Sequence, residues 1–228
     1  MTTPSSVDDK RRRPGRGRSD TKERLLQAGE RLFAKEGIHR VRLRELNELA
    51  GQRNSSALHY HFGSRDGLVT AILTRHQELV DGRLGERLDE LEAAGKPAPI
   101  RALVEAIVRP LSGELETRSG RDFLRIVPQV LPALSRNLRS GRPAPTTTET
   151  QRLLDLLERG MGALPPPVRR ERLVAYALVL TGILADRALQ IESGRPMVLD
   201  SEQFVAHLVD TIAAALTAPS TVAFPASG

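Results

Sequence analysis

Residues 21 to 73 constrain the fold of this chain more than any other segment, because signals that start and stop helices recur there at short intervals. Asp20 and Glu23 have the spacing of a capping box, which begins a helix. Gly37 can supply the left-handed residue that ends one. Leucines and a phenylalanine repeat between these signals at helical spacing, so a first helix of about four turns is expected.

Two shorter helices are expected to follow in the same segment. The first runs from Leu43 to Ala50, with Leu46 and Leu49 turned inward, and Gly51 ends it. The second begins at a cap, Asn54 or Ser55, and ends near Phe62. Leu58 and Phe62 are four residues apart on one helical face, which we expect to be buried.

Three short helices around a tight turn are typical of the helix-turn-helix, in which the third helix reads the major groove of DNA. If Leu58 and Phe62 are buried, a polar set on the third helix is left to contact DNA: Ser55, Ser56, His59, Tyr60 and His61. The rings of His59 and His61 would point about 200° apart on a helix, so a shared metal ion is not expected.

The run LHYHFGSRDGLV, from Leu58 to Val69, resembles the end of the recognition helix and the start of the connecting helix in the tetracycline-repressor (TetR) family of bacterial transcriptional regulators. The resemblance extends over residues 21 to 73, and the rest of the chain is similar only in length and helical pattern. It implies a homodimer, and it aligns Arg44 with a position that contacts bases. Lys22, Asn54 and Arg65 complete the predicted DNA-binding set.

The segment departs from the family pattern in two places. Arg42 stands where the family usually has Ser or Thr at the cap of the second helix, so Glu45 is expected to lack its capping partner and Arg42 to face phosphate. The stretch between Gly51 and Leu58 is one residue longer than the common pattern, which changes the register of the residues that begin the recognition helix.

The charge distribution favours DNA binding independently of the resemblance. Residues 10 to 65 hold 15 Lys and Arg against 6 Asp and Glu, whereas residues 66 to 228 hold 19 against 20. Neutralising phosphates and releasing their counterions requires such a surplus beside the helix-turn-helix. The nearly neutral remainder must have another task.

Lys10 to Ser19, KRRRPGRGRS, is too polar and too rich in Gly and Pro to fold alone. Its P-G-R-G-R sequence is similar to the core of the AT-hook, although the closing proline of that motif is absent. We therefore expect residues 1 to 19 to form a disordered basic arm. Arg16 and Arg18 would insert into the minor groove, and a solvated tail is the alternative.

Further helices are expected after the DNA-binding domain of residues 20 to 66. They run from residue 65 to 94, 100 to 115, 123 to 138, 147 to 161, 168 to 192 and 201 to 217, and prolines at positions 110, 128 and 132 interrupt two of them. No segment alternates like a strand, so the expected fold is all-α. Residues 67 to 217 would form a regulatory and dimerisation domain, and residues 218 to 228 a flexible tail.

The helix from Val168 to Glu192 is apolar nearly all round, and the last helix has too narrow an apolar stripe to cover it alone. A second subunit would cover it in a four-helix bundle, and burial within one chain is the alternative. The predicted dimer interface consists of Leu173, Tyr176, Leu180, Ile183, Leu184, Phe204, Leu208, Ile212 and Leu216.

Composition excludes several classes of protein. The absence of cysteine excludes a disulfide framework and thiolate chemistry. No secretory signal is visible, and the most apolar run, Leu173 to Ala185, is shorter than the roughly 20 residues that span a bilayer, so a soluble cytoplasmic protein without a membrane partner is expected. No phosphate-binding loop or nucleophile elbow occurs, and we expect no catalytic site, no cofactor and no metal ion.

The sequence therefore predicts a homodimeric regulator, most simply a repressor, that binds a palindromic operator and releases it when a small molecule enters the C-terminal domain. An architectural DNA-binding protein is one alternative, favoured by the AT-hook-like arm, and an enzyme on a helical scaffold is another. The aromatic content of 3% favours an aliphatic or acyl effector, which helices between Ile100 and Met161 would enclose.

Overall fold

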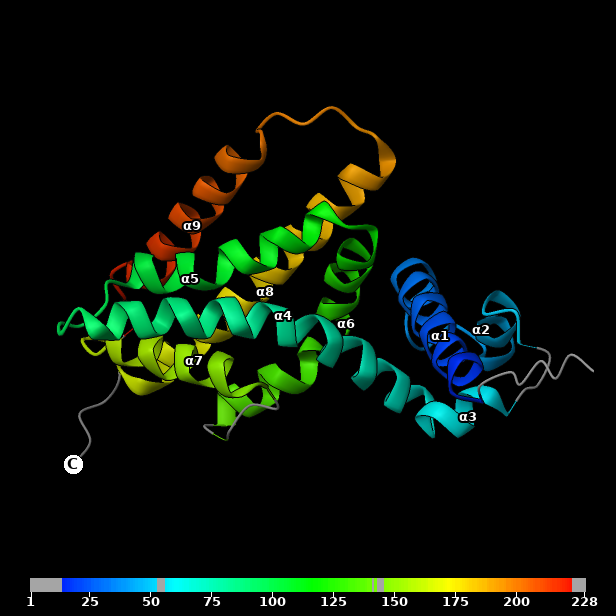
Figure 1. The fold of residues 1–228 in the computed structure, drawn as a ribbon. Helices are drawn as coiled ribbons and strands as arrows, with labels where there is room; N and C mark the ends of the chain where they lie inside the picture. Colours follow the sequence, from blue (N-terminus) through cyan, green and yellow to red (C-terminus); the bar gives the residue numbers. More distant parts are fainter. Residues whose placement is uncertain (1–13, 53–55, 141, 143–145, 223–228) are drawn as a thin grey trace, which may run out of the picture.

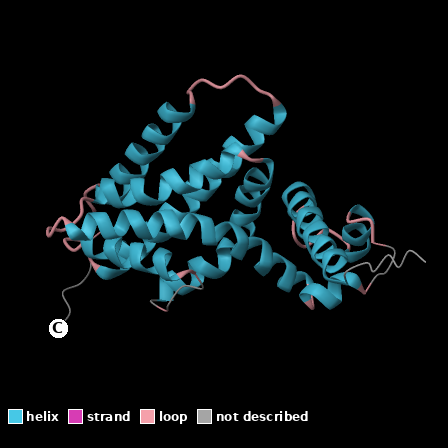
Figure 2. Ribbon diagram, in the orientation of Figure 1, coloured by secondary structure: helices cyan, strands magenta, loops and turns pink. Residues whose placement is uncertain are grey.

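The structure is a computed structural model that describes residues 14–52, 56–140, 142 and 146–222. These residues form helices joined by loops and contain no strand, which confirms the all-α prediction (Figure 2). The elements are α1 (Pro14–Glu36), α2 (Leu43–Leu49), α3 (Ala57–Phe62), α4 (Arg65–Ala93), α5 (Ile100–Gly113), η1 (Glu114–Glu116), α6 (Arg118–Ser140), α7 (Thr148–Gly160), α8 (Pro166–Ser193) and α9 (Ser201–Thr217).

Helices α1 to α3 form a small domain at one end of the molecule, and α4 runs from it along the larger domain formed by α5 to α9 (Figure 1). The small domain has its own core, which includes Leu25, Phe33, Leu46 and Leu58. Ile126 of α6 is fully buried in that same core, so the larger domain reaches into the smaller one. The two domains are therefore joined by packing as well as by α4.

Helix α1 begins at Pro14, six residues before the predicted start at Asp20. Proline is compatible with the first turn of a helix, where its missing N–H has no partner to lose. The backbone of Arg16 and Arg18 is therefore helical, so residues 14 to 19 do not belong to the disordered arm predicted for residues 1 to 19. The rest of the predicted arm, residues 1 to 13, lies outside the described residues.

The prolines expected to interrupt helices lie inside continuous ones. Helix α5 continues through Pro110, and α6 continues through Pro128 and Pro132. A proline removes the hydrogen bond to the carbonyl four residues earlier but leaves the rest of the ladder in place. Burial of apolar side chains on both helices compensates for those missing bonds, since the two helices contribute much of the large core.

Most of the predicted dimer interface is buried inside the single chain. Eight of the nine residues are at most 9% exposed: Leu173, Tyr176, Leu180, Leu184, Phe204, Leu208, Ile212 and Leu216. The prediction failed because α6 packs along α8 and α5 packs along α9, so the inner faces of both helices are covered without a second chain. Only Ile183, 36% exposed, keeps a surface that another molecule can contact.

Helix α8 nevertheless carries a second apolar face. Leu178, Val179, Ile183 and Leu189 are exposed along it, opposite the face that enters the core. By length and composition alone, the helix of residues 166–192 is apolar enough to cross a membrane, since an 18-residue window within it has a mean hydropathy of 1.4. The core accounts for one apolar face of this helix, and the exposed residues form a stripe, here called the α8 stripe, that has no cover within the described chain.

Candidate functional site: DNA-binding surface, cavity and polar network

The turn between α2 and α3 is built by a glycine and a local backbone pattern. Gly51 has a φ of 67°, which favours glycine, and the N–H of the next residue, Gln52, donates to the carbonyl of Asn47 at 2.8 Å. This pattern ends α2 and turns the chain toward α3. Leu58, 2% exposed, then anchors α3 in the core of the small domain.

The face of α3 opposite Leu58 points to solvent. Tyr60 is 65% exposed and His59 is exposed beside it, whereas His61 and Phe62 are half-buried. The cap position of α3 is the exposed Ser56, rather than the predicted Asn54 or Ser55, both of which lie outside the described residues. Four of the predicted contacts, Ser56, His59, Tyr60 and His61, are therefore brought together on or beside one short helix.

Helix α2 adds exposed cations beside this helix. The side chain of Arg44 is 86% exposed and forms an ion pair with Glu48, one turn further along α2, at 2.6 Å. Arg42 is exposed at the cap position. Its backbone N–H donates to the carboxylate of Glu45 at 2.8 Å, so the expectation that Glu45 would lack a capping partner is wrong. Lys22 is exposed on α1.

Two predicted placements in the small domain are corrected. Leu49, expected to point inward, is 56% exposed. Arg65, predicted to contact DNA, instead donates from its guanidinium to the backbone carbonyls of Val41 at 2.6 Å and His39 at 3.5 Å. It holds the loop before α2 against the start of α4. No sequence signal identifies such a role, because the acceptors are backbone atoms more than 20 residues away.

The large domain contains an apolar cavity of about 130 Å³ that is partly open to solvent. Its walls come from α4 to α8, and they include Ile107, Leu111, Phe123, Leu131, Leu154, Tyr176 and Leu184. Gln77 and Asp81 add polar groups, and the hydroxyl of Thr147 donates to Asp81 at 2.8 Å. Burial raises the pKa of the Asp81 carboxyl, while the bond from Thr147 opposes that shift. Helices between Ile100 and Met161 thus form part of the walls, together with α4 and α8.

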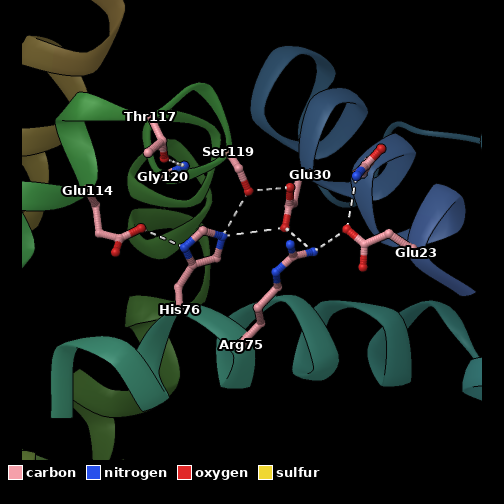
Figure 3. A network of polar contacts seen from close by, with 9 residues as sticks. Glu23, Glu30, Arg75, His76, Glu114, Thr117, Ser119 and Gly120 are labelled. Carbon is pink, nitrogen blue, oxygen red and sulfur yellow. Dashed lines mark hydrogen bonds and ion pairs between the residues drawn. The ribbon is translucent and has the colours of Figure 1, made fainter. Parts of the chain in front are cut away.

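A buried polar network lies where the two domains meet (Figure 3). The ring of His76 on α4 contacts Glu114 of η1 at 2.6 Å and Glu30 of α1 at 3.4 Å. The hydroxyl of Ser119 on α6 donates to Glu30 at 2.6 Å. Sequence reasoning missed this network, because Glu30, His76 and Glu114 are scattered along the chain and no local pattern connects them.

Comparison with known proteins identifies the small domain. Residues 25–72 match the family model of bacterial regulatory proteins, tetR family. The N-terminal domain belongs to the TetR family. This match covers the helix-turn-helix and the beginning of α4, and it confirms the resemblance seen in the sequence.

Two curated TetR-family relatives, both from Pseudomonas putida, align with 107 residues of this chain. The probable HTH-type transcriptional regulator ArpR is 35% identical and the HTH-type transcriptional regulator TtgR is 34% identical; each alignment covers 46% of this chain and 49% of the relative. The aligned part of the chain thus spans about half the length of these relatives. Both are named as regulators of transcription, not as enzymes.

The fold of most of the chain is similar to that of a solved repressor. NalD of Pseudomonas aeruginosa, described as the secondary repressor of the MexAB-OprM multidrug efflux pump, superposes with a TM-score of 0.56 over 86% of this chain and 96% of its own. The two sequences are 19% identical, so this comparison supports the fold alone.

Proposed function

We propose that this protein is a ligand-responsive, homodimeric transcriptional regulator, most simply a repressor, that binds a palindromic DNA operator in the cytoplasm. The observation that carries the proposal is the exposed face of α3, with Tyr60 and His59 beside the exposed Arg44 of α2. Helix α3 is short, is anchored by one leucine and lies at the surface beside cations. These properties allow a helix to enter the major groove.

In this proposal the exposed groups divide the work between phosphates and bases. Tyr60, His59 and Arg42 bind phosphate, which fixes the position of the domain on DNA but carries no sequence information. Arg44 and Ser56 reach base edges, where the guanidinium of Arg44 can donate two hydrogen bonds to guanine. Arg44 must leave Glu48 to do so, because its Nε now donates to that carboxylate.

Dimerisation is proposed through the α8 stripe and the exposed face of α9. Leu178, Val179 and Ile183 offer apolar side chains on α8, and exposed alanines, Ala206 and Ala214, give α9 a small-residue face. A second copy related by a two-fold axis would bury both faces in a four-helix bundle. We propose a second copy of this chain as the partner of these faces, because a palindromic site requires two DNA-binding domains held at a fixed spacing.

The effector is proposed to enter the apolar cavity. At about 130 Å³ the cavity is smaller than the 300 to 1,000 Å³ of a typical ligand pocket, so a ligand would have to expand it. The lining favours an apolar compound with one polar group directed toward Asp81 or Gln77. Ligand binding would then shift the population toward a spacing of the heads that does not match the operator.

Selection from random DNA duplexes tests the DNA-binding function. The purified protein should enrich an inverted repeat whose half-sites are one helical turn, or a multiple of it, apart. Native mass spectrometry of protein purified from the cell should detect a co-purified apolar compound. Enrichment of no common sequence would contradict the proposal and favour an architectural DNA-binding protein.

A further inference from the structure

The polar network at the domain junction contains three ionisable groups from three different elements. Glu30 of α1 is 2% exposed, His76 of α4 is 4% exposed and Glu114 of η1 is 9% exposed. The imidazole lies between the two carboxylates, with its Nδ1 2.6 Å from Glu114 and its Nε2 3.4 Å from Glu30 (Figure 3). The DNA-binding domain thus contributes one buried charge to a site completed by the other domain.

Glu30 is held by more than the histidine. The hydroxyl of Ser119, near the start of α6, donates to Glu30 at 2.6 Å and lies 3.3 Å from Nε2 of His76. Arg75 of α4 forms an ion pair with Glu23 at 2.8 Å and lies 3.9 Å from Glu30. Both α4 and α6 are therefore tied to α1 by charged or hydroxyl groups.

Burial makes these contacts sensitive to the position of α1. A carboxylate that is out of water is strongly disfavoured unless it keeps its cation and its hydrogen bonds. If α1 moves away from α4 and α6 by a fraction of its own diameter, Glu30 is separated from His76 and Ser119 together. Orientations in which the contacts are only partly made are therefore disfavoured, and the junction has a preferred arrangement.

The same histidine is in contact with the wall of the apolar cavity. Phe123 lines that cavity and its ring stacks on the ring of His76, with centroids 4.6 Å apart and planes 13° from parallel. Phe123 is only 2% exposed, so its ring is surrounded by other side chains. A ligand that displaced the ring of Phe123 would therefore also change the position of the imidazole that is stacked on it.

The position of Glu114 relative to α6 is fixed by close packing. A Cβ atom added to Gly120 of α6 would lie 2.2 Å from the backbone oxygen of Glu114, so α6 and η1 approach each other as only glycine permits. The N–H of Gly120 also donates to the hydroxyl of Thr117 at 2.9 Å. Glu114 is therefore held at a set position relative to α6, and the ring of His76 is positioned between Glu114, Phe123 and Glu30.

We propose that His76 is the positioning residue through which the cavity acts on the DNA-binding domain: it holds Glu30 of α1 in place while its ring rests on Phe123 of the cavity wall. The inference rests on the proposed function for naming the cavity as the effector site. That the preferred orientation of the junction depends on His76 is a separate statement, which can be tested without DNA or effector.

The groups that face His76 define what protonation does to the junction. Carboxylates approach it from α1 and η1, and the hydroxyl of Ser119 approaches from α6. Arg75, its neighbour on α4, is directed toward Glu23 and Glu30. Arg118 and Asp122 of α6 lie nearby, and Asp122 pairs with Arg31 of α1 at 3.4 Å. If His76 were neutral, Glu30 would keep one cationic partner, Arg75. Glu114 would have no cationic partner among the groups named here.

Electron spin resonance can measure the distance between the two domains directly. Because the chain has no cysteine, spin labels attach only to cysteines that are introduced. Spin labels are attached at E48C on α2 and E90C on α4, whose side chains are 59% and 64% exposed. Labelled chains are diluted with unlabelled ones, so that only distances within one chain contribute. Neither label touches the network, and no DNA is present.

We expect one distance population in the parent and a shifted or second population in H76Q, E30Q and F123L. The H76Q/F123L pair should shift no further than either single variant, because both act through one contact. Raising the pH from 7 to 10 should move the parent toward the H76Q distribution and leave H76Q unchanged. H39Q, the same change at an exposed histidine in the loop before α2, should behave like the parent.

An unchanged distance distribution in H76Q and in the parent at pH 10 would overturn the proposal. If H76Q fails to fold, S119A, which removes one hydroxyl, and the pH series on the parent chain give the same answer: no shift in either overturns it. Loss of operator binding has no bearing on these distances, so failure of this inference and failure of the proposed DNA-binding function are seen separately.

Discussion

The guanidinium of Arg65, at the first residue of α4, donates to the backbone carbonyl of Val41 at 2.6 Å. This bond connects the start of the linking helix to the loop before α2, and a second, longer bond reaches His39 at 3.5 Å. Arg65 therefore holds the loop before α2 against the start of the linking helix. An arginine that the sequence predicts for the DNA-binding surface thus contacts, in the structure, the backbone that supports that surface.

Replacing Arg65 with alanine should destabilise the DNA-binding domain. The carbonyl of Val41 would be left without its partner in a partly buried site, which costs about 1 to 3 kcal/mol. Urea unfolding should show the destabilisation as a lower midpoint with an unchanged slope. R65K should fall between the parent and R65A, because one ammonium cannot reproduce the fork that reaches both carbonyls.

Arg87 offers a matched control on the same helix. Its side chain is 48% exposed and pairs with Glu90, so R87A should change the free energy of unfolding by less than about 0.5 kcal/mol. Equal stability of R65A and R87A would mean that Arg65 is free to contact DNA, as the sequence pattern suggests.

The α2 and α3 surface predicts two different kinds of DNA-binding defect. Tyr60→Ala should weaken binding to all duplexes by a similar factor, because a phosphate contact carries no sequence information. Arg44→Ala should reduce affinity for the selected operator roughly 5- to 150-fold and relax the preference at one base pair. Competition titrations against single-base variants of the operator measure both effects.

Glu48 supplies the opposite test. E48Q removes the carboxylate that Arg44 pairs with at 2.6 Å while keeping the shape of the side chain, so operator affinity should rise. An unchanged affinity in Y60A, R44A and E48Q alike would exclude this face as the DNA-binding surface.

The assembly prediction follows from the contrast between two neighbouring leucines on α8. Leu178 is 50% exposed and Leu180 is 3% exposed. L178E should give folded monomers, because it places a charge in the proposed interface only, whereas L180E should unfold the large domain, because it buries an unpaired charge. Sedimentation and circular dichroism distinguish the two outcomes.

An exposed leucine away from α8 provides the control for that experiment. Leu79 on α4 is 61% exposed, so L79E makes the same chemical change outside the proposed interface and should remain a dimer. If L178E sediments as a dimer, or the parent as a monomer at micromolar concentration, the α8 stripe is not the subunit interface.

The junction network predicts how stability depends on pH. Burial lowers the pKa of His76, but the hydrogen bonds and charges of Glu114 and Glu30 outweigh it and raise the pKa to about 9. Because this pKa lies above the unfolded value near 6.5, the stabilisation is fully present below about pH 6.5 and is lost as the pH rises toward 9. The shift corresponds to at most about 3 kcal/mol.

Urea unfolding of the parent and of H76Q between pH 6 and 9.5 measures this contribution. The difference in unfolding free energy between the two proteins should shrink as the pH rises, whereas H39Q should follow the parent throughout. A difference that is constant across this range would show that His76 is not charged in the folded protein.

The sequence predicts the helices of this protein well where their ends are marked by local chemistry. Gly37 and Gly51 have φ values of 93° and 67°, and both end helices where glycine is expected to do so. The start of α1 is missed because Asp20 and Glu23 imitate a capping box inside a longer helix. A capping pattern shows that a helix can begin at a residue, and only the neighbouring structure decides whether it does.

The functional sites are less predictable because their partners are brought together by packing. Hydropathy correctly marks Leu180 and Ile212 for burial, yet it cannot tell whether α6 or a second chain covers them. In the sequence His76 is one of several scattered histidines, since the groups that give it meaning come from α1, η1 and α6. Contacts between distant segments leave no periodic trace in a single sequence.

The last prediction concerns the basic residues before α1, which lie outside the described part of the structure. Residues 10 to 13 are Lys-Arg-Arg-Arg, and they precede a helix whose exposed Lys22 lies in the predicted DNA-binding set. Deleting residues 1 to 13 should leave the dimer intact and lower operator affinity. The slope of log K against log salt should fall by about 0.9 for each phosphate that the shortened protein no longer neutralises.

The sequence flanking the operator decides whether these residues enter the minor groove or meet only the backbone. Fixing the backbone of one residue costs roughly 1 to 2 kcal/mol, which a narrow A/T-rich groove with enhanced negative potential is best able to offset. The decrease in affinity on deletion should therefore be greater with A/T-rich flanks than with G/C-rich flanks. Four alanines at residues 10 to 13 should reproduce the deletion, because charge and not length is the cause. Equal affinity and equal salt slope for the full-length and shortened proteins would assign these residues no part in DNA binding.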